Sequence, residues 1–299
     1  MLPDISDERD SSAHMMSGHA ALICNPRSGT LSKMPDAAAA LEAAIEAAGF
    51  TLMVRPGHDL PLEEQWEQAR LAGARTVFAA GGDGTLRAIA ALALRDGVTL
   101  GLLPGGTMNR VCARLGLTAD PVTCVGQFTP GDERTLDVGM VNGEVFLFQS
   151  LLGAPARLLR FREMQRGEGL LGWLPLVRMA WRKLRALRVG RVRLSLGDGE
   201  RLQGSAAVIT LPEPEAPTLL SVGVTNQVST FRRLGQALSW FRGRLADSPD
   251  AEVRLTNRLA AFSRRSWMRI SLDGEMLLLA PPLRYRLIPG GLRILSPRS

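Results

Sequence analysis

The sequence predicts a two-domain protein, with an N-terminal α/β domain on a doubly wound parallel sheet and a β-rich C-terminal domain. Two observations support this prediction. Strand-like apolar runs alternate with helix-like segments up to about residue 115, which is typical of a parallel α/β sheet. From about residue 137, short apolar or period-two runs separated by turns indicate a β-rich domain. A chain of 299 residues is long enough to bury two cores.

The α/β elements follow one another closely. Ala20 to Cys24 is an apolar run that leads into a turn, and we expect a buried strand there. The alanine-rich stretch from Asp36 to Ala48 predicts a helix that Gly49 ends. Further strands are expected at 50–54, 76–80 and 99–103, and further helices at 62–71, 86–94 and 107–115.

The β-rich region and the ends of the domains are predicted from the same patterns. Residues 1–18 contain four acidic residues and no apolar run, so they predict a disordered tail rather than a signal peptide. We place the α/β domain at 19–134 and the second domain at 135–299. Strands of the second domain are expected at 144–148, 191–196, 206–211, 219–224, 252–255 and 267–272.

Three predicted strands end in loops that contain glycine. These loops begin at Asn25, Gly81 and Pro104, and each precedes a predicted helix. Ligands of open α/β sheets lie outside the carboxyl ends of the strands, so the three loops are expected to converge on one ligand. The spacing matches neither the P-loop nor the dinucleotide fingerprint.

The second of these loops, Gly81-Gly82-Asp83-Gly84-Thr85, has the chemistry of a phosphate site. Glycine lets the backbone approach a phosphate closely, and the amides at a helix N-terminus attract its charge. Asp83 can hold a metal-bound water or a nucleotide hydroxyl. Taken alone, the loop is also compatible with a plain turn.

Composition and charge limit the classes of partner and the cellular location that we expect. The formal net charge is +7 and the pI is about 10.4, which favours an anionic partner. Basic residues are concentrated between Arg157 and Arg193. Three cysteines without a CxxC pair predict neither a disulfide framework nor a zinc site and fit a reducing cytoplasm. No apolar stretch is long enough to span a membrane, so any membrane contact is expected to be peripheral.

Five motifs in order resemble the catalytic family of diacylglycerol kinases, which includes bacterial lipid kinases and sphingosine kinases. The first three motifs lie at the three glycine loops, the fourth at the start of the second domain, and the fifth near the C-terminus. In this sequence they are Asn25-Pro26-x-Ser28-Gly29, Gly81 to Thr85, Gly106-Thr107-x-Asn109, Arg134 to Gly143, and Asp273-Gly274-Glu275 followed by Ile288 to Leu292.

The resemblance implies a nucleotide domain followed by a β-sandwich, with the active site between them. ATP and Mg²⁺ would bind near the second loop, with Asp83 at the metal, and Glu275 would accept the proton of a lipid hydroxyl beside Asp273. Asp137 would orient the substrate or cap a turn. The nucleotide residues would be Asn25, Arg27, Ser28, Gly29, Gly81, Gly82, Asp83, Gly84, Thr85, Gly106, Thr107 and Asn109.

Two segments can be explained either by function or by structure alone. Without the other motifs, Asp273-Gly274 is typical of a solvent-facing hairpin turn. The stretch from Leu170 to Val189 mixes Trp and Leu with basic residues and predicts a helix at an anionic phospholipid surface, or a helix packed on the second domain. The expected lipid kinase is cytoplasmic and peripherally bound to the membrane, and a homodimer is left open.

The sequence also departs from the family. Residues 211–220 lack the glycines and the aspartate of a structural metal site, which argues against a second metal. Arg87 and Arg110 replace frequent acidic residues near the nucleotide loops. Residues 151–155 lack the aspartate of sphingosine-type members, which favours a diacylglycerol-like substrate.

Three other functions compete with the lipid kinase. A NAD kinase shares the Gly-Gly-Asp-Gly loop and the two-domain plan. A catalytically silent nucleotide- or lipid-binding protein is suggested by the missing metal loop at 211–220 and by Arg87 and Arg110. Nucleic-acid binding rests on charge alone, since no recognition motif or stacking platform supports it, and no nucleic-acid partner is expected.

Overall fold

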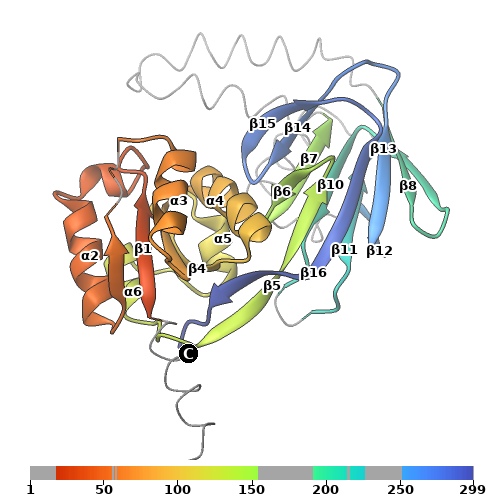
Figure 1. Cartoon of the computed structure of the whole chain (residues 1–299). Coiled ribbons are helices and arrows are strands. Elements are labelled where there is room, and N and C mark those ends of the chain that lie inside the picture. Colours follow the sequence, from red (N-terminus) through yellow and green to blue (C-terminus); the bar gives the residue numbers. More distant parts are fainter. Residues whose placement is uncertain are drawn as a thin grey trace, which may run out of the picture. The chain divides into compact units, whose positions relative to one another are not determined.

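The computed structural model describes residues 18–55, 57, 59–153, 191–213, 216–225 and 251–298. The chain divides into two compact units, which are described separately (Figure 1). Unit 1 is formed by Met1–Val138 and Ile288–Ser299, and unit 2 by Gly139–Leu287. Most of the predicted N-terminal tail, and the whole predicted membrane helix at 170–189, lie outside the described residues.

Unit 1 is built on a parallel sheet. Its strands are β1 (His19–Cys24), β2 (Thr51–Val54), β3 (Thr76–Gly81), β4 (Thr99–Pro104) and the last part of β16 (Leu283–Leu295). The strand order is β2-β1-β3-β4-β16, and every neighbouring pair is parallel. All residues of β3 and β4 are buried, as expected for central strands that are covered on both faces.

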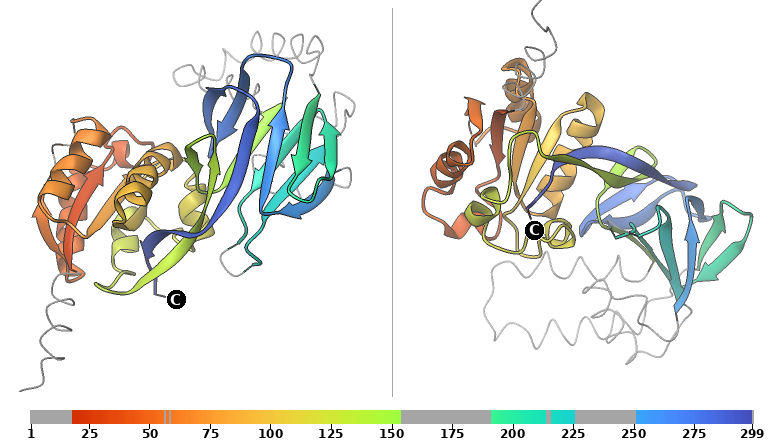
Figure 2. Two further views of the ribbon diagram at one scale, coloured as in Figure 1. Left: turned by 45° about the vertical axis from the view of Figure 1, so that its right-hand side comes forward. Right: turned by 90° about the horizontal axis from the view of Figure 1, so that it is seen from below.

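Helices cover both faces of this sheet (Figures 1 and 2). They are α2 (Ala37–Ala47), α3 (Leu62–Leu71), α4 (Asp83–Asp96), α5 (Arg110–Arg114) and α6 (Pro121–Val125), with a short 3-10 turn, η1, at Leu31–Lys33. Helix α2 packs with α6, and α3 packs with α4. The chain moves outward from β1 to β2 and then back past β1 to β3, so right-handed connections place α2 and α3 on opposite faces. The predicted doubly wound sheet is confirmed.

Aromatic packing explains one glycine of the core. The Phe78 ring lies edge-on to Phe50, with ring centroids 4.9 Å apart, and 6.1 Å from Phe128. A Cβ atom on Gly101 of the neighbouring strand would lie 2.5 Å from Cδ1 of Phe78. Gly101 therefore makes room for this ring, which the sequence alone does not reveal.

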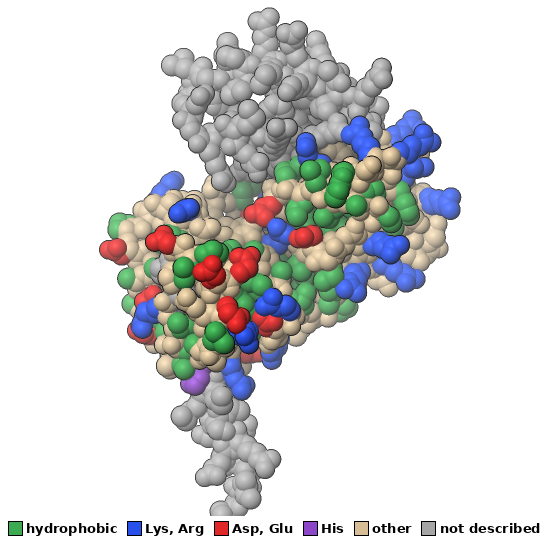
Figure 3. Space-filling view, turned by 45° about the horizontal axis from the view of Figure 1, so that its top comes forward, with side chains coloured by type: hydrophobic (Ala, Val, Ile, Leu, Met, Phe, Trp, Pro, Cys, Tyr) green, Lys and Arg blue, Asp and Glu red, His purple; other side chains and the backbone are tan. Residues whose placement is uncertain are grey.

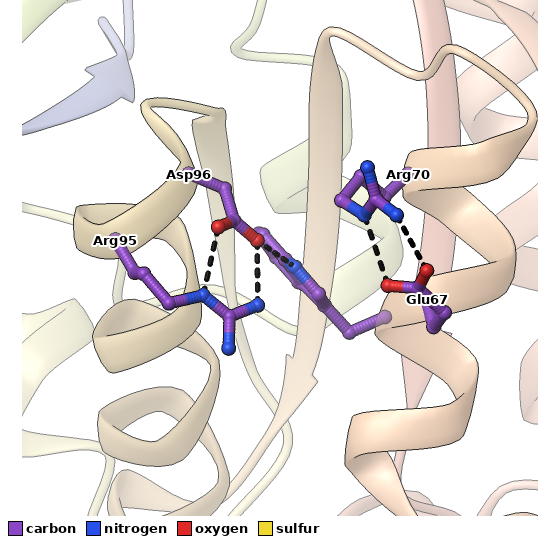
Figure 4. Close-up of polar contacts among 5 residues, drawn as sticks. Glu67, Arg70, Arg95 and Asp96 are labelled. Carbon is purple, nitrogen blue, oxygen red and sulfur yellow. Dashed lines mark hydrogen bonds and ion pairs between the residues drawn. The ribbon is translucent and has the colours of Figure 1, made fainter.

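A buried indole joins α3 to the end of α4 (Figure 4). Trp66 is 1% exposed, and its Nε1 donates a hydrogen bond of 2.7 Å to Oδ2 of Asp96. Arg95 also contacts this carboxylate, and together these hydrogen bonds lower the pKa of Asp96 to about 2. On α3 itself, Glu67 and Arg70 form an exposed ion pair one turn apart. The Trp66 contact fixes the C-terminal end of the helix whose N-terminal end carries the glycine loop.

Unit 2 consists of two antiparallel sheets around one core. The six-stranded sheet has the order β12-β11-β10-β7-β14-β15. Its inner face packs against strands of the other sheet, and side chains of both sheets, such as Ile270 and Leu194, belong to one buried cluster. This confirms the predicted β-rich sandwich. The strands of the first sheet are β7 (Gln149–Gly153), β10 (Ala206–Thr210), β11 (Leu220–Thr225), β12 (Ala251–Thr256), β14 (Met268–Leu272) and β15 (Glu275–Leu279).

The other sheet contains β8 (Val192–Leu196), β9 (Arg201–Gly204), β13 (Arg258–Phe262) and the first part of β16. Strand β5 (Glu133–Val141) pairs with β6 (Glu144–Phe146) and with β16. In the core of unit 2, the hydroxyls of Ser150 and Tyr285 lie 3.0 Å apart, and burial raises the pKa of Tyr285. The single tyrosine of the chain is therefore a core residue.

The domain limits differ from those predicted. The change of unit falls after Val138, whereas the sequence placed the boundary after residue 134, and Ile288–Ser299 belong to unit 1. The reason is that β5 and β16 are long strands that pass through both units, so no turn or linker marks the boundary. Strands β5, β7, β9, β13, β15 and β16 and the short helix α6 are additional to the predicted elements.

Candidate functional site

Three loops of unit 1 meet at the carboxyl ends of its central strands. The backbone amide of Asn25, after β1, donates to the carbonyl of Ala80 in β3 at 2.9 Å. The amide of Gly105, after β4, donates to the carbonyl of Gly81 at 2.8 Å. The parallel pairing of β1, β3 and β4 thus continues into the loops, and the predicted convergence of the loops is observed.

Side chains tie the first loop to the second. The Asn25 side-chain amide donates to the hydroxyl of Thr85 at 3.1 Å. The backbone amide of Gly82 donates to the hydroxyl of Ser28 at 3.3 Å. Asn25 and Ser28, which were predicted to contact nucleotide, therefore also fix the first loop against the start of α4.

Thr30 completes this network. Its hydroxyl donates to the carbonyl of Gly106 at 2.7 Å, and its backbone amide donates to the carbonyl of Gly105 at 2.9 Å. Neither Thr30 nor Gly105 is among the predicted nucleotide residues. The available signal was weak, because Thr30 only follows the Asn-Pro-x-Ser-Gly motif directly and a threonine after a glycine is ordinary turn chemistry.

The close contact between loops explains several glycines without any ligand. A Cβ atom on Gly106 would lie 2.5 Å from the Cα of Gly82, and one on Gly105 would lie 2.8 Å from the amide nitrogen of Gly81. A Cβ on Gly29 would collide with the hydroxyl of Thr107. At Gly105 and Gly106 glycine is required because backbone meets backbone, whereas at Gly29 it makes room for the side chain of Thr107.

Asp83 is the first residue of α4 and connects the second loop to the third. Its Oδ1 accepts a hydrogen bond from the backbone amide of Val111 at 3.0 Å. Burial raises the pKa of Asp83, while this hydrogen bond and the charge of Arg110 act in the opposite direction. The carboxylate predicted to bind metal thus also caps α5, and Arg110 contributes to keeping it ionised.

Asn109 holds the third loop in shape. It has a positive φ of 47°, and its Oδ1 accepts a hydrogen bond from the amide of Gly106 at 2.7 Å. The next residue, Arg110, begins α5, so Asn109 is the N-cap residue of that helix. Thr107, which lies between Gly106 and Asn109, is exposed. Of this motif, Thr107 is the residue whose side chain reaches solvent and can contact a ligand.

The N-terminus of α4 is suited to an anion. Gly82 is its N-cap, and the first intrahelical hydrogen bond runs from the amide of Leu86 to the carbonyl of Gly82 at 3.0 Å. The amides of residues 83–85 precede that bond, so they lack a partner within the helix and carry the positive end of its dipole. Arg27, in the first loop, is exposed and adds a flexible positive charge. The loops and this helix end together can bind a polyphosphate.

Asp273 of unit 2 is buried within backbone donors. It is 5% exposed, and its carboxylate accepts hydrogen bonds from the amides of Leu147 at 2.7 Å, Phe148 at 2.9 Å and Gln149 at 2.9 Å. Its own amide donates to the carbonyl of Gln149 at 2.9 Å. The predicted hairpin turn at Asp273-Gly274 is present, and both residues have positive φ. The prediction that this turn faces solvent is wrong for the side chain of Asp273, which is buried.

Glu275 follows this turn as the first residue of the edge strand β15 and is exposed. It lies directly opposite Leu272 in the β14–β15 pair. The anchored Asp273 therefore fixes the turn that presents Glu275 to solvent. A carboxylate in this position can accept a proton from a substrate hydroxyl.

Asp137 joins the two long strands of the chain. Its Oδ1 accepts a hydrogen bond of 2.8 Å from the amide of Gly290, which has a positive φ of 56°. Asp137 is half-buried. This hydrogen bond gives Asp137 a structural role, because it holds a residue of β16 that has positive φ. A role in orienting the substrate stays a prediction.

Comparison with known proteins identifies the class and then the family. Over 93% of this chain and 97% of its own, a diacylglycerol kinase structure from Bacillus anthracis shares the fold, with a TM-score of 0.64 at 16% sequence identity. This defines the class as proteins with the two-domain diacylglycerol kinase fold. Residues 19–141 match the diacylglycerol kinase catalytic domain.

Curated relatives extend this match to most of the chain. A Pseudomonas fluorescens protein named "probable lipid kinase YegS-like" is 30% identical over 294 residues, which is 87% of this chain and 91% of its own. An uncharacterised protein from Synechocystis is 22% identical over 251 residues, 77% of this chain and 57% of its own. The chain belongs to the diacylglycerol kinase catalytic family, a family of lipid kinases.

Proposed function

We propose that the protein transfers the γ-phosphoryl group of ATP to a hydroxyl of diacylglycerol or a related lipid. The observation that carries this proposal is the hydrogen-bonded convergence of three loops on the N-terminus of α4. Such a site suits a nucleotide because phosphoryl transfer depends on positioning and on charge stabilisation. Family membership supplies the lipid as acceptor.

Within this proposal, the nucleotide contacts divide into two kinds. Backbone amides at Asp83, Gly84 and Thr85, with the side chains of Arg27 and Thr107, face the phosphates. A second group shapes the loops, and in it Asn25, Ser28 and Asn109 act mainly through the hydrogen bonds they make to other loop residues. Replacing Asn25, Ser28 or Asn109 is therefore expected to weaken nucleotide binding by distorting the three loops.

The residues present fit a magnesium ion held with the nucleotide. Mg²⁺ commonly binds through one or two carboxylates together with substrate phosphates, and Asp83 offers one carboxylate at the loop. The described residues contain no cluster of three His, Cys, Asp or Glu that could hold a metal without substrate. When bound, Mg²⁺ would neutralise negative charge on the phosphates. Burial disfavours the ionised form of Asp83 and so raises its pKa. A cation next to the carboxylate would stabilise the ionised form.

Glu275 is the proposed proton acceptor and Asp273 the residue that positions it. Glu275 is exposed at the start of an edge strand, where a hydroxyl can approach it. Asp273 holds the turn through three backbone amides, which uses both of its carboxylate oxygens. Direct proton transfer is therefore assigned to Glu275 alone.

The membrane is the proposed location of the substrate, and the protein is proposed to act from the cytoplasm. In the described residues, no helix has the length and apolar character needed to cross a bilayer. Peripheral contact with anionic phospholipid agrees with the net charge of +7. Whether a homodimer forms can be measured by light scattering alongside the activity assays.

A lipid-panel assay tests the proposal. Purified protein with labelled ATP and Mg²⁺ is offered diacylglycerol, monoacylglycerol, ceramide, sphingosine and, in a parallel tube, NAD, and products are identified by mass. We expect label on diacylglycerol or a close relative, and none with Glu275→Gln. Phosphate on NAD alone would establish the NAD kinase alternative. ATP binding without any product would indicate a silent binding protein.

A further inference from the structure

An exposed apolar and basic surface lies at the β13–β14 connection and the adjoining β14–β15 hairpin of unit 2. We call it the 262–278 patch, and it comprises Phe262, Arg264, Arg265, Trp267, Arg269 and Leu278. Trp267 is 61% exposed, Leu278 56% and Phe262 41%. In Figure 3, the part of unit 2 in view shows hydrophobic side chains bordered by Lys and Arg, whereas acidic side chains are more frequent on unit 1.

Strand geometry explains why these side chains point outward. Met268 and Ile270 of β14 belong to the buried cluster between the sheets, so Arg269 between them faces away from it. Trp267, which directly precedes the strand, is exposed as well. Leu278 lies directly opposite Arg269 in the β14–β15 pair. An exposed aromatic, an exposed aliphatic and a guanidinium therefore share one face of the hairpin.

A second pair extends the patch across the β13–β14 connection. Phe262, the last residue of β13, lies directly opposite Arg193 of β8, which is also exposed. Residues 263–267 link Phe262 to β14 and include Arg264 and Arg265, both exposed. From Phe262 to Arg269, both included, the sequence has three arginines and no acidic residue.

The guanidinium groups of the patch differ from other arginines of the protein. Arg55, Arg70, Arg95 and Arg254 each form ion pairs with neighbouring carboxylates. Within the part of the chain that the structure describes, no ion pair involves the arginines of the patch. Their charge is therefore available to an external anion.

We propose that the 262–278 patch docks the protein onto an anionic lipid bilayer, with Trp267 and Leu278 entering the headgroup region and the arginines contacting lipid phosphates. Tryptophan favours the membrane interface because one end of its ring is apolar and the other carries a hydrogen-bond donor. Basic residues add attraction to anionic lipid. An exposed leucine contributes to lipid contact but offers no stacking surface to a nucleotide base, so a bilayer fits better than nucleic acid.

The docking role rests on the proposed lipid kinase function. It adds to that function a surface that brings the enzyme to its lipid substrate. Glu275 and Leu278 lie on the same strand, three residues apart, which corresponds to about 10 Å at roughly 3.3 Å per residue. The strand that carries the proposed proton acceptor also carries a membrane-contacting side chain. Because the spacing is odd, the two side chains lie on opposite faces of the strand. Docking through Leu278 would therefore bring the strand end that carries Glu275 close to the bilayer, with the Glu275 side chain on the other face of the strand.

The first test is sedimentation of the full chain with vesicles of phosphatidylcholine containing 30% phosphatidylserine. One basic residue at an anionic surface strengthens binding by a factor of roughly 5. The variant Arg264→Ala/Arg265→Ala is therefore expected to bind about 25-fold more weakly, and Trp267→Ser also to bind more weakly. The matched controls are Arg75→Ala and Leu71→Ser, which change an exposed arginine and a leucine that is 72% exposed in unit 1. They should bind like the wild type.

The second test measures insertion directly. An environment-sensitive fluorophore is attached to Trp267→Cys or, as control, to Leu71→Cys, while the three native cysteines are buried and react poorly. We expect a blue shift on vesicle addition for the label at position 267 alone. Unchanged vesicle binding by the arginine and tryptophan variants, or equal spectra for the two labels, would overturn the proposal. So would loss of RNA binding in these variants while vesicle binding remains.

Activity separates this inference from the proposed function. With diacylglycerol dispersed in detergent micelles, the patch variants should keep wild-type turnover and lose activity only on vesicles. Failure of the wild type to phosphorylate any lipid, with patch-dependent vesicle binding intact, would remove the kinase function and leave the docking surface. Loss of micelle activity in properly folded patch variants would contradict a docking role.

Discussion

The carboxylate of Asp83 and the backbone amide of Val111 lie 3.0 Å apart, although 28 residues separate them in the chain. This contact joins the N-terminus of α4 to that of α5 and so holds two of the glycine loops together. The same carboxylate is the one proposed to face the metal, and burial raises its pKa. One side chain thus makes a structural hydrogen bond and carries the charge that is proposed to face the metal.

The variant Asp83→Asn should separate these two contributions. Asparagine can still accept the Val111 hydrogen bond, but it removes a charge whose burial is unfavourable. We expect an unfolding temperature equal to or above that of the wild type, together with a loss of ATP-dependent turnover of roughly 100-fold or more. Scanning calorimetry and the kinase assay give the two values. Full activity in this variant would exclude Asp83 from metal binding.

The contact between Gly106 and Gly82 predicts a steric effect. In Gly106→Ala the new Cβ would lie 2.5 Å from the Cα of Gly82, so the second and third loops must separate. We expect the free energy of unfolding to fall by about 1–3 kcal/mol and the affinity for ATP to decrease. Gly126→Ala is the control, because its Cβ would lie 3.4 Å from the nearest atom. Equal ATP affinity in the two variants would show that loop contact does not shape the site.

Asp273 and Glu275 should respond differently to loss of charge. Asp273→Asn replaces an acceptor of three backbone hydrogen bonds by a group that also carries donors, so we expect a loss of roughly 2–4 kcal/mol of stability. Glu275→Gln changes an exposed side chain and should alter stability by less than about 0.5 kcal/mol while abolishing turnover. Urea denaturation and lipid phosphorylation measure these effects. A Glu275→Gln enzyme with wild-type turnover would require another base.

Asp96 predicts a dependence of stability on pH. Hydrogen bonds from Arg95 and Trp66 lower its pKa to about 2, below the roughly 3.9 expected in the unfolded chain. Its stabilising contribution is therefore fully present above about pH 4 and is lost as the pH falls through about 2. We expect Asp96→Asn to reduce stability by about 1 kcal/mol or less at pH 7, since the pair is partly solvated. The difference from the wild type should vanish near pH 2 in denaturation series, and a constant difference at all pH values would contradict this origin.

Much of unit 1 could be predicted from the sequence because its elements are local. An apolar run such as Ala20 to Cys24 and an alanine-rich helix starting near Asp36 depend on nearby residues only. The order of the three loops was predictable for the same reason. Their hydrogen bonds were not, because partners such as Asn25 and Thr85 are 60 residues apart. Whether a glycine faces phosphate or another loop depends on such distant contacts.

The second unit was harder to predict because its strands pair across long separations. Gln149 to Gly153 follows β6 almost directly, and only the antiparallel partners on both sides define it as a strand. Taken without the other motifs, Asp273-Gly274 predicts a solvent-facing turn, and the burial of Asp273 had no local signal because its three amide partners lie about 125 residues earlier. The return of residues 288–299 to unit 1 had no signal either, since β16 continues without a break.

This return gives the protein a definite order of assembly. Ile294 pairs with Leu100 of β4, and Leu292, Ile294 and Leu295 are almost fully buried. The ribosome makes these residues only after the whole of unit 2, so the sheet of unit 1 cannot be completed while unit 2 is still being synthesised. Strand β4 keeps an unpaired edge during that time, which is an exposed site for association with other chains. The sheet of unit 1 is thus completed only after unit 2 has been synthesised, although the three glycine loops of unit 1 are encoded much earlier.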